Sequence, residues 1–347
     1  MRIFSERNNR SSISILKNIP SRIEYASGEP SKAYFDNGQF CSLGCLGCIN
    51  PKCMKFEATE IICSEAENFP NDKSVNVCPV DALSWDNDRE IPRIDSEKCI
   101  DCGICLRRCP VGAMYYNDGV YVNTAASCQQ IVVSADSDAK RLQKEQILLL
   151  ERVERRGVFI MESDELMKSV YEKLNRLKPQ FHNTVGRNLL ISLGCNSAMR
   201  RIGDVYTRMD AVYSSPDGAF GAVEVEFGRD TLDASRGILD DIAVLYTRYG
   251  INKSANLPLV ICLQLPNIRQ GYWQVVKDIK NVEDIAISTI TIGAMLLLNW
   301  NGCPLNSDGV TYYLDYDNTD LRSAISRQLD RQIDISNKLL GILEPQK

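Results

Sequence analysis

Apolar and polar positions follow two different patterns along this chain of 347 residues. The first third is rich in turn-forming residues and holds short apolar segments, such as 32–36 and 92–95, that predict short strands. A helical composition at 138–156 then predicts a connecting helix that stops at Gly157. The rest of the chain predicts, in order, a helix at 164–177, strands at 189–193, 205–213 and 219–227, a helix at 232–249, a strand at 257–265, a helix at 272–280, a strand at 287–298 and a helix at 320–343. Because the chain is also longer than one hydrophobic core usually organises, we predict two domains.

Composition and charge narrow the possible classes of protein. The formal net charge of −5 argues against a protein that coats nucleic acid non-specifically, because that mode needs many phosphate-neutralising Lys and Arg side chains. The single histidine, His182, excludes any site that needs two histidines within one chain. The first ten residues lack the apolar run of a signal peptide, and the longest apolar stretch, 285–300, is short and interrupted. We therefore expect a cytoplasmic protein without a membrane span.

The cysteines are concentrated in one region, where ten of the 14 lie between Cys41 and Cys109. The segment from Cys99 to Pro110 reads Cys-Ile-Asp-Cys-Gly-Ile-Cys-Leu-Arg-Arg-Cys-Pro, which is a C-x2-C-x2-C-x3-C-P spacing. An upstream half-repeat supports it, because Cys78-Pro-Val-Asp-Ala resembles Cys109-Pro-Val-Gly-Ala. These motifs resemble the dicluster ferredoxins, whose thiolates hold two [4Fe-4S] clusters.

The resemblance implies that each cluster takes one ligand from the other half-repeat. The first cluster would then be held by Cys78, Cys99, Cys102 and Cys105. The second needs Cys109 and three upstream thiolates, and aligning 34–36 with 93–95 places Cys41 opposite Cys99. We therefore predict a second set formed by Cys41, Cys45, Cys48 and Cys109. Cys53 could replace one of these, and Cys63 has no assigned place.

Two other interpretations of the cysteine spacing, each with a different bound group, stay open. The spacing Cys41-x3-Cys45-x2-Cys48 also binds the cluster of radical S-adenosylmethionine enzymes, but the glycine-rich loop and the long alternation of strands and helices that those enzymes need are not found downstream. C-x2-C pairs also suit tetrahedral zinc. The two Cys-Pro halves fit zinc less well than they fit iron–sulfur clusters.

A second group of candidate residues is acidic. Asp210 lies on one predicted strand, and Glu224 and Glu226 lie on the next. Residues two apart on a strand point to the same face, and an antiparallel neighbour can bring Asp210 beside the two glutamates. Three acids on an otherwise apolar strand pair are costly unless they bind a cation such as Mg²⁺ or Mn²⁺. The simpler alternative is a hairpin whose charges face solvent.

With its flanking helices and strands, the region 160–300 resembles the PD-(D/E)XK nucleases. The resemblance implies that Asp210 and Glu224 hold the metal ion and that Glu226 is the third catalytic residue. Two departures are that Met209 replaces the usual proline and that Glu226 stands where lysine is common. A helix glutamate often completes such a site, and the candidates are Glu165 and Glu172.

Several other residues receive weaker assignments. A phosphate-binding wall could be built from Lys168, Lys173, Arg176, Lys178, Arg187, Arg200, Arg201 and Arg208. A solvated helix face explains the first four equally well. We expect His182 to be structural. Ordinary core positions are expected for Cys128, Cys195, Cys262 and Cys303.

The predicted fold is an α+β dicluster ferredoxin-like domain followed by an α/β restriction-endonuclease-like domain with a central mixed sheet flanked by helices. The predicted boundaries are an extension at 1–30, the iron–sulfur domain at 31–125, a connecting helix at 126–157 and the nuclease-like domain at 158–347. The function that this implies is metal-dependent hydrolysis of DNA, while RNA, a protein partner and a homo-oligomer stay open. The alternatives are a ferredoxin-type electron-transfer protein whose C-terminal domain docks a partner, and an inactive nuclease-fold binding module.

Overall fold

The computed structural model describes residues 23–25, 32–35, 40–42, 45, 48–88, 91–109, 113–117, 121–124, 158–228, 231–306, 321–336 and 341–346. The chain divides into two compact units. The first unit consists of Met1–Lys55, Asn76–Met161 and Trp300–Gly302. The second consists of Phe56–Val75, Glu162–Asn299 and Cys303–Lys347. The predicted connecting helix lies outside the described residues, as does most of the predicted extension at 1–30.

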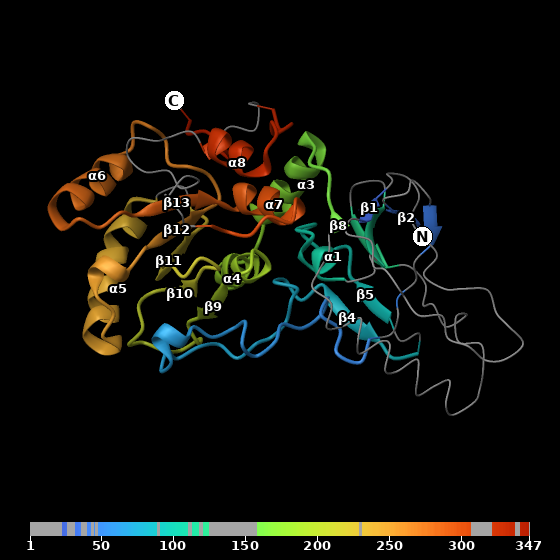
Figure 1. Ribbon diagram of the computed structural model, residues 1–347, viewed down its shortest axis with the longest axis horizontal. Helices are drawn as coiled ribbons and strands as arrows, with labels where there is room; N and C mark the ends of the chain where they lie inside the picture. The colour runs from blue at the N-terminus through green and yellow to red at the C-terminus, as the bar shows by residue number, and fades with distance from the viewer. Residues whose placement is uncertain are drawn as a thin grey trace, which may run out of the picture. The chain divides into compact units, whose positions relative to one another are not determined.

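Short strands build the first unit (Figure 1). They are β1 (Ile23–Tyr25), β2 (Lys32–Phe35), β3 (Phe40–Ser42), β4 (Leu83–Asp86), β5 (Ile91–Ile94), β6 (Met114–Asn117), β7 (Tyr121–Thr124) and β8 (Val158–Phe159), with helix α1 (Ile104–Arg108) between β5 and β6. One sheet has the order β3-β2-β1-β8, while β4 pairs with β5 and β6 pairs with β7 as antiparallel hairpins. The strands predicted at 32–36 and 92–95 are confirmed as β2 and β5.

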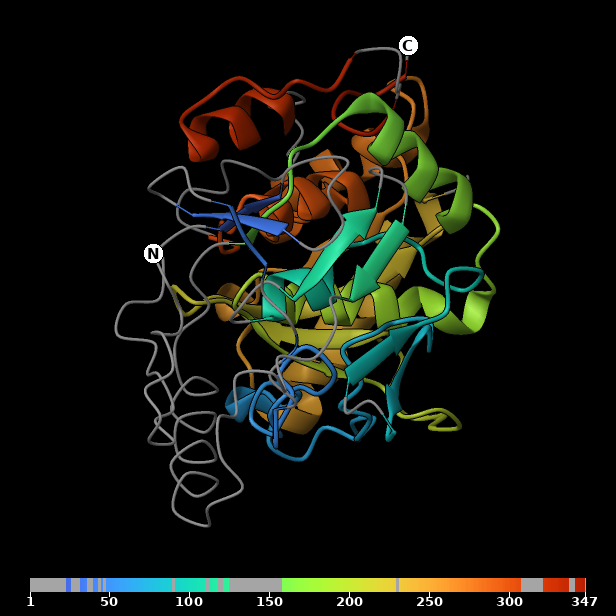
Figure 2. The same cartoon turned by 90° about the vertical axis from the view of Figure 1, so that its right-hand side faces the viewer.

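Each hairpin follows one of the two Cys-Pro half-repeats. Strand β4 begins at the same sequence distance after Cys78 as β6 does after Cys109. The two hairpins appear as cyan and teal arrows in Figure 2, and β5 lies beside β7. Val77, Ile104 and Leu106 are fully buried beneath them. The internal repeat seen in the sequence is therefore repeated in the structure.

A five-stranded mixed sheet forms the centre of the second unit, with the order β13-β12-β11-β10-β9. The strands are β9 (Asn196–Met199), β10 (Ala211–Ser214), β11 (Phe220–Glu226), β12 (Leu259–Cys262) and β13 (Ser288–Thr291). The helices are α3 (Asp164–Leu174), α4 (His182–Ser192), α5 (Leu232–Tyr249), α6 (Gly271–Glu283), α7 (Ile292–Trp300) and α8 (Leu321–Leu329). Strands β9, β10 and β11 are antiparallel neighbours, whereas β11, β12 and β13 run parallel and are joined through α5 and α6. The predicted mixed sheet with flanking helices is confirmed.

Helices α4 and α5 cover opposite faces of this sheet. Gly186 of α4 lies against the side chain of Val225, and Gly237 of α5 lies near the carboxyl group of Glu224. Successive residues of a strand point to opposite faces. The Glu224 side chain therefore projects beneath α5.

Several predicted elements of the second unit match the structure, and others do not. Helix 232–249 is confirmed as α5, and the helices at 164–177 and 272–280 are confirmed as α3 and α6. The strand predicted at 189–193 is wrong, because these residues form the end of α4. A short continuous apolar run fits a buried strand or a buried helix equally well, and periodicity alone cannot distinguish them.

Three other predicted elements are too long. The strand predicted at 205–213 is reduced to β10, which is preceded by a loop of turns at 200–210. The strand predicted at 287–298 divides into β13 and the buried helix α7. In the last segment, α8 ends at Leu329 and the described residues beyond it are irregular.

Segment 56–75 is an insertion between two cysteines of the first unit that packs on the second. It covers the free edge of β9, where the N–H of Asp72 donates to Met199 O (2.7 Å) and the N–H of Ser197 donates to Glu60 O (3.0 Å). The buried guanidinium group of Arg187 donates to Ser74 O (3.0 Å). An uncovered edge strand would invite pairing with another chain, so this segment protects the sheet.

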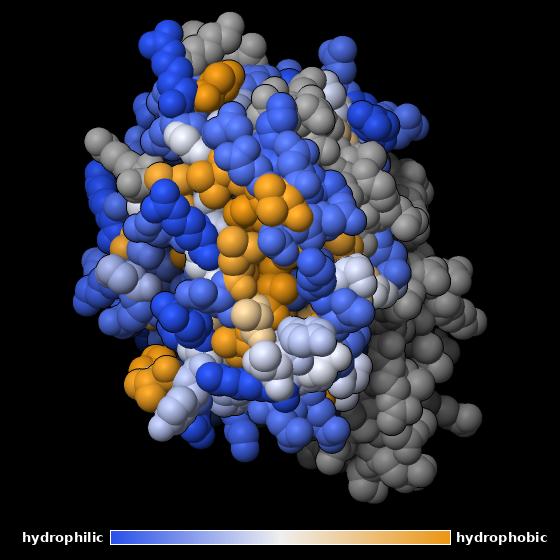
Figure 3. Space-filling view, turned by 90° about the vertical axis from the view of Figure 1, so that its left-hand side faces the viewer, coloured by the Kyte–Doolittle hydropathy of each residue, from blue (hydrophilic) through white to orange (hydrophobic). Residues whose placement is uncertain are grey.

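The face of the second unit that Figure 3 shows is mainly hydrophilic. Figure 3 shows a stripe of apolar side chains on the face that carries α5 and α6, surrounded by polar ones. No helix within the described part of the chain is long and apolar enough to cross a membrane.

Candidate functional site

Four cysteines of the first unit line one pocket. The pocket has a volume of about 360 Å³, including its open mouth, and its other lining residues are mainly apolar, among them Val77, Val80 and Ile104. Its thiols belong to Cys78, Cys99, Cys102 and Cys105. The structure thus brings together the whole predicted first set. Four converging thiols in an apolar pocket are the donor set that an iron–sulfur cluster requires.

Burial and crowding make these thiols difficult to ionise without a metal. Burial raises the pKa of Cys102 well above its usual value, and the neighbouring Cys78 and Cys99 raise it further. Burial and the same neighbours, together with Cys102, raise the pKa of Cys105. Cluster binding supplies the compensating positive charge and releases the thiol protons.

The loop that carries three of these cysteines has an unusual backbone. Asp101 and Gly103 both adopt positive φ angles, of 57° and 74°. A Cβ atom on Gly103 would lie 2.5 Å from Cδ1 of Ile160 and 3.1 Å from Nε1 of Trp300. Only glycine fits here, because the conformation is left-handed and the space is already filled.

Polar contacts fix the same loop from outside. The indole N–H of Trp300 donates to Cys102 O (3.0 Å), and the hydroxyl of Tyr116 donates to Asp101 O. Trp300 is fully buried. The loop is therefore held in shape by residues that are distant in sequence, and the cysteine spacing gave no sign of them.

A second group of thiols includes Cys53. Burial raises the pKa of Cys53, and the thiols of Cys109, Cys48 and Cys45 each raise it further. Cys53 in turn raises the pKa of Cys105, so the two groups are neighbours. For Cys41, only the backbone in β3 is described, where it pairs with Ala33. Cys45, Cys48, Cys53 and Cys109 are therefore neighbours that could hold a second cluster, and the predicted role of Cys41 stays a prediction because its side chain lies outside the described residues.

The two half-repeats make the same hydrogen bond to sulfur. The N–H of Ala82 donates to Sγ of Cys78, and the N–H of Ala113 donates to Sγ of Cys109, both at 3.2 Å. Each bond spans four residues of a matching Cys-Pro-Val-x-Ala segment. Backbone N–H groups directed at sulfur stabilise thiolate charge and tune the potential of a bound cluster.

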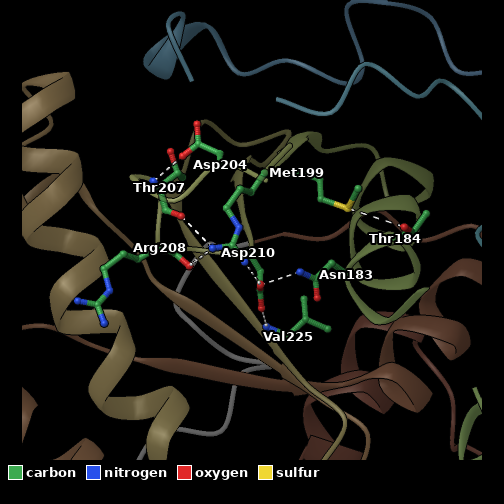
Figure 4. A network of polar contacts seen from close by, with 9 residues as sticks. Asn183, Thr184, Met199, Asp204, Thr207, Arg208, Asp210 and Val225 are labelled. Atoms are coloured by element: carbon green, nitrogen blue, oxygen red, sulfur yellow. Dashed lines mark hydrogen bonds and ion pairs between the residues drawn. The ribbon is translucent and has the colours of Figure 1, made fainter. Parts of the chain in front are cut away.

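The predicted acidic site in the second unit is occupied by protein donors. Asp210 accepts hydrogen bonds from Nδ2 of Asn183 (2.6 Å) and from the N–H of Val225 (3.0 Å), and it lies 3.8 Å from a guanidinium nitrogen of Arg200 (Figure 4). Burial raises the pKa of Asp210, although these donors oppose the shift. Both of its oxygens are therefore already engaged.

Glu224 lies between Asp210 and a third acid, Asp241 of α5. Burial, followed by the charges of these two neighbours, raises the pKa of Glu224 to about 10. Burial also raises the pKa of Asp241 to about 6. No N–H or O–H donor within the described part of the chain reaches the buried Asp241 carboxylate, so a protonated Glu224 is the group that can donate to it. At neutral pH the pair holds one proton.

Protein donors engage Asp210, whereas neither oxygen of the buried Asp241 carboxylate has a donor within the described part of the chain. The crowding of these acids raises the pKa of Glu224. Among the described residues, no three His, Cys, Asp or Glu side chains are grouped so as to hold a single metal ion. Glu226 accepts from the N–H of Gly228 at the end of β11.

Sequence reasoning missed two members of this site. Asp241 stands on the apolar stripe of α5, between the buried Ile238 and Leu245, and a polar residue on such a stripe was a signal that could have been used. Asn183, at the start of α4, gave no signal. The helix candidates Glu165 and Glu172 are exposed on α3.

His182, Arg187 and the cysteines outside the two thiol sets have structural surroundings. The ring of His182 stacks on Phe227 at 4.3 Å, which agrees with the expected structural role. The prediction that Arg187 belongs to a phosphate-binding wall is wrong, because its side chain is buried and binds segment 56–75. Cys195 and Cys262 are buried core residues as expected, Cys303 is half-buried, and Cys128 lies outside the described residues. Cys63 is buried and directs its thiol at Asn196 O (3.5 Å).

Comparison with known proteins supports the first unit. A family model for a 4Fe-4S dicluster domain matches residues 75–113. The chain is 34% identical over 84 residues to an uncharacterized ferredoxin of Methanocaldococcus jannaschii, covering 22% of this chain and 52% of that protein. It is 48% identical over 46 residues to a 7Fe ferredoxin of Hydrogenibacillus schlegelii, covering 13% and 56%.

A third relative is the thiosulfate reductase electron transfer subunit of Salmonella typhi, 34% identical over 62 residues, with coverage of 18% of this chain and 30% of that protein. The chain spans about half the length of the first curated relatives it matches. No solved structure matches it. The dicluster ferredoxin prediction is therefore confirmed for residues 75–113, and the comparisons give no support to a fused nuclease domain, to Mg²⁺ or Mn²⁺, or to DNA as a partner.

Proposed function

We propose that this chain is an electron-transfer protein whose first unit holds two [4Fe-4S] clusters. The observation that carries the proposal is the grouping of eight thiols into two neighbouring sets of four. One set is Cys78, Cys99, Cys102 and Cys105. The other is Cys45, Cys48, Cys53 and Cys109, in which Cys53 takes the place that the sequence suggested for Cys41.

Three further observations support electron transfer. Cys53 raises the pKa of Cys105 although the two belong to different sets, so an electron could pass between adjacent clusters. The relatives that the cysteine region resembles include ferredoxins and an electron transfer subunit. The matching N–H to sulfur bonds at Cys78 and Cys109 would tune both clusters in the same way.

For the second unit, the same proposal assigns a binding role and no nuclease activity. Asp210 is engaged by Asn183, Val225 and Arg200, which supports this assignment. A proton held by Glu224, whose pKa burial raises, would lower the charge of the buried acids. This arrangement favours an inactive module that docks a partner.

The proposal is tested with protein purified or reconstituted without oxygen. We expect about eight iron atoms per chain, reversible reduction, and rapid electron release to an artificial acceptor. Incubation with single- and double-stranded DNA and RNA in the presence of Mn²⁺ should give no cleavage. Redox-inert clusters, or Mn²⁺-dependent cleavage that the Glu224→Gln variant abolishes, would contradict the proposal.

A further inference from the structure

The 200–210 loop of the second unit exposes three large apolar side chains. Ile202 is 85% exposed, Val205 is 80% exposed and Tyr206 is 73% exposed. Single exposed apolar residues are ordinary, but three within five positions of one loop form a patch that is costly unless a partner covers it.

The backbone of this loop is fixed although its apolar side chains are exposed. Oδ1 of Asp204 accepts from the N–H groups of Tyr206 (2.9 Å) and Thr207 (2.8 Å). The Arg200 guanidinium group donates to Thr207 O (2.9 Å), and that of Arg248 on α5 donates to Tyr206 O (2.6 Å). Figure 4 shows the Asp204 turn above Asp210. A loop that is already ordered loses little conformational entropy when it binds, which favours recognition.

Three arginines lie in or beside this loop, together with the acidic Asp204 and Asp240. Arg201 and Arg248 are exposed, and the guanidinium group of Arg208 lies 3.3 Å from Asp240 with most of its surface open to solvent. An apolar centre with a basic rim complements a protein surface with an acidic rim. Two of the three exposed apolar side chains, Ile202 and Val205, are aliphatic and cannot stack on bases, so a protein surface fits this patch better than nucleic acid does.

The loop is joined to the segment that leads to the cysteines. The N–H of Arg201 donates to Pro70 O (2.9 Å), and Asn71 forms an antiparallel bridge with Arg200. Segment 56–75, to which Pro70 and Asn71 belong, continues along the chain into Cys53 at one end and Cys78 at the other. A partner on this loop would therefore bind next to the segment that joins the second unit to Cys53 and Cys78.

We propose that the 200–210 loop, with Arg248 at the end of α5, docks the acidic face of a redox partner protein. This inference rests on the electron-transfer function proposed above. Encounters between redox proteins bury little surface, so a single ordered loop with a helix end has an adequate size. Recognition would depend on the charges of Arg201, Arg208 and Arg248 and on the apolar contacts of Ile202, Val205 and Tyr206.

The test measures electron transfer by stopped flow from the reduced holoprotein to two oxidised acceptors. One acceptor is an acidic flavodoxin, and the other is hexacyanoferrate, which is too small to need a docking surface. We expect Val205→Asp and Arg201→Glu each to slow transfer to flavodoxin by about tenfold, and high salt to slow the wild type similarly. Transfer to hexacyanoferrate should not change. The matched control is Val282→Asp on α6, which alters an equally exposed apolar residue (77%) away from the loop.

Each other outcome has a distinct meaning. If wild-type protein reduces flavodoxin and both loop variants do so at the same rate, the docking surface is wrong and electron transfer stands. Wild-type protein that reduces hexacyanoferrate but not flavodoxin also overturns the docking surface. If it reduces neither acceptor, both proposals are wrong. Loop variants that lose binding to a fluorescent single-stranded oligonucleotide but keep the flavodoxin rate would make the loop a nucleic-acid surface and would overturn the inference.

Discussion

The thiol sets of the first unit and the carboxyl groups of the second differ in what completes them. The four thiols of the pocket line one mainly apolar cavity, where burial and crowding raise the pKa values of Cys102 and Cys105 and the N–H of Ala82 donates to Sγ of Cys78. Among the acids of the second unit, Asp210 accepts from Asn183 and Val225, while neither oxygen of the Asp241 carboxylate has a donor within the described residues. The two groups therefore differ in the donors that reach them.

The largest effect that tests this comparison is the loss of a cluster. Cys99→Ser removes one thiolate from the pocket set, and we expect the iron content to fall from about eight to about four atoms per chain, or the first unit to unfold. Cys262→Ser, at a buried core cysteine of β12, is the control that should keep all the iron. Iron analysis with optical spectra measures both, and full iron retention in Cys99→Ser would contradict the assignment.

A second pair of variants tests which cysteines belong to the second thiol set, the one that includes Cys109. We expect Cys53→Ser to lose about half of the iron, because its buried thiol lies among Cys45, Cys48 and Cys109. Cys41→Ser should keep the full amount. If Cys41→Ser loses about half of the iron and Cys53→Ser keeps it, the second set is the one predicted from the sequence, with Cys41 in place of Cys53.

A third comparison tests how tightly the loop of the first cluster is built. Gly103 and Gly203 both have positive φ, but a Cβ atom at Gly103 would collide with Ile160, whereas Gly203 has nothing within 4 Å. We expect Gly103→Ala to lower the free energy of unfolding by about 2–4 kcal/mol and Gly203→Ala by about 1 kcal/mol. Denaturant unfolding of the holoprotein measures this, and equal losses would show that crowding is unimportant.

The smallest predicted effect is a pH dependence from the acid pair. The pKa of Glu224 is raised to about 10 in the folded state, so between its unfolded value and pH 10 the folded state binds one more proton than the unfolded state. Stability is therefore greatest below the unfolded pKa and falls as pH rises toward 10. Glu224→Gln should flatten the decline of unfolding free energy between pH 6 and pH 9, by at most about 1.4 kcal/mol per pH unit. A variant with the same slope as the wild type would exclude the shared proton.

The sequence was most informative where ligand spacing is local. The motif from Cys99 to Cys109 and the repeat at Cys78 needed only short-range spacing, and the structure gathers the predicted first set. The choice between Cys41 and Cys53 stays a prediction, because half-repeat alignment cannot reveal where segment 56–75 leaves the first unit. The bracing of Cys102 by Trp300 was unpredictable, since these residues are far apart in the chain.

In the second unit, the sequence predicted the long helices and the acidic residues but not the groups that surround those acids. Its long helices were predictable from their periodicity, and α5 matches its predicted range. The run at 189–193 was assigned as a strand because buried helices and strands share the same continuous apolar pattern. Spacing identified Asp210 and Glu224, but the donors that satisfy them come from other elements, such as Asn183 of α4 and Asp241 of α5. The sequence shows which residues are acidic, whereas the protonation of these residues depends on the groups that the fold brings around them.

The most direct test of the central claim is a reductive titration of anaerobically prepared protein followed by electron paramagnetic resonance. The account predicts about eight iron atoms per chain, reversible reduction, and a signal broadened by interaction between two neighbouring clusters, since Cys53 and Cys105 lie close together. A protein that holds zinc in place of iron, or clusters that cannot be reduced and reoxidised, would contradict it.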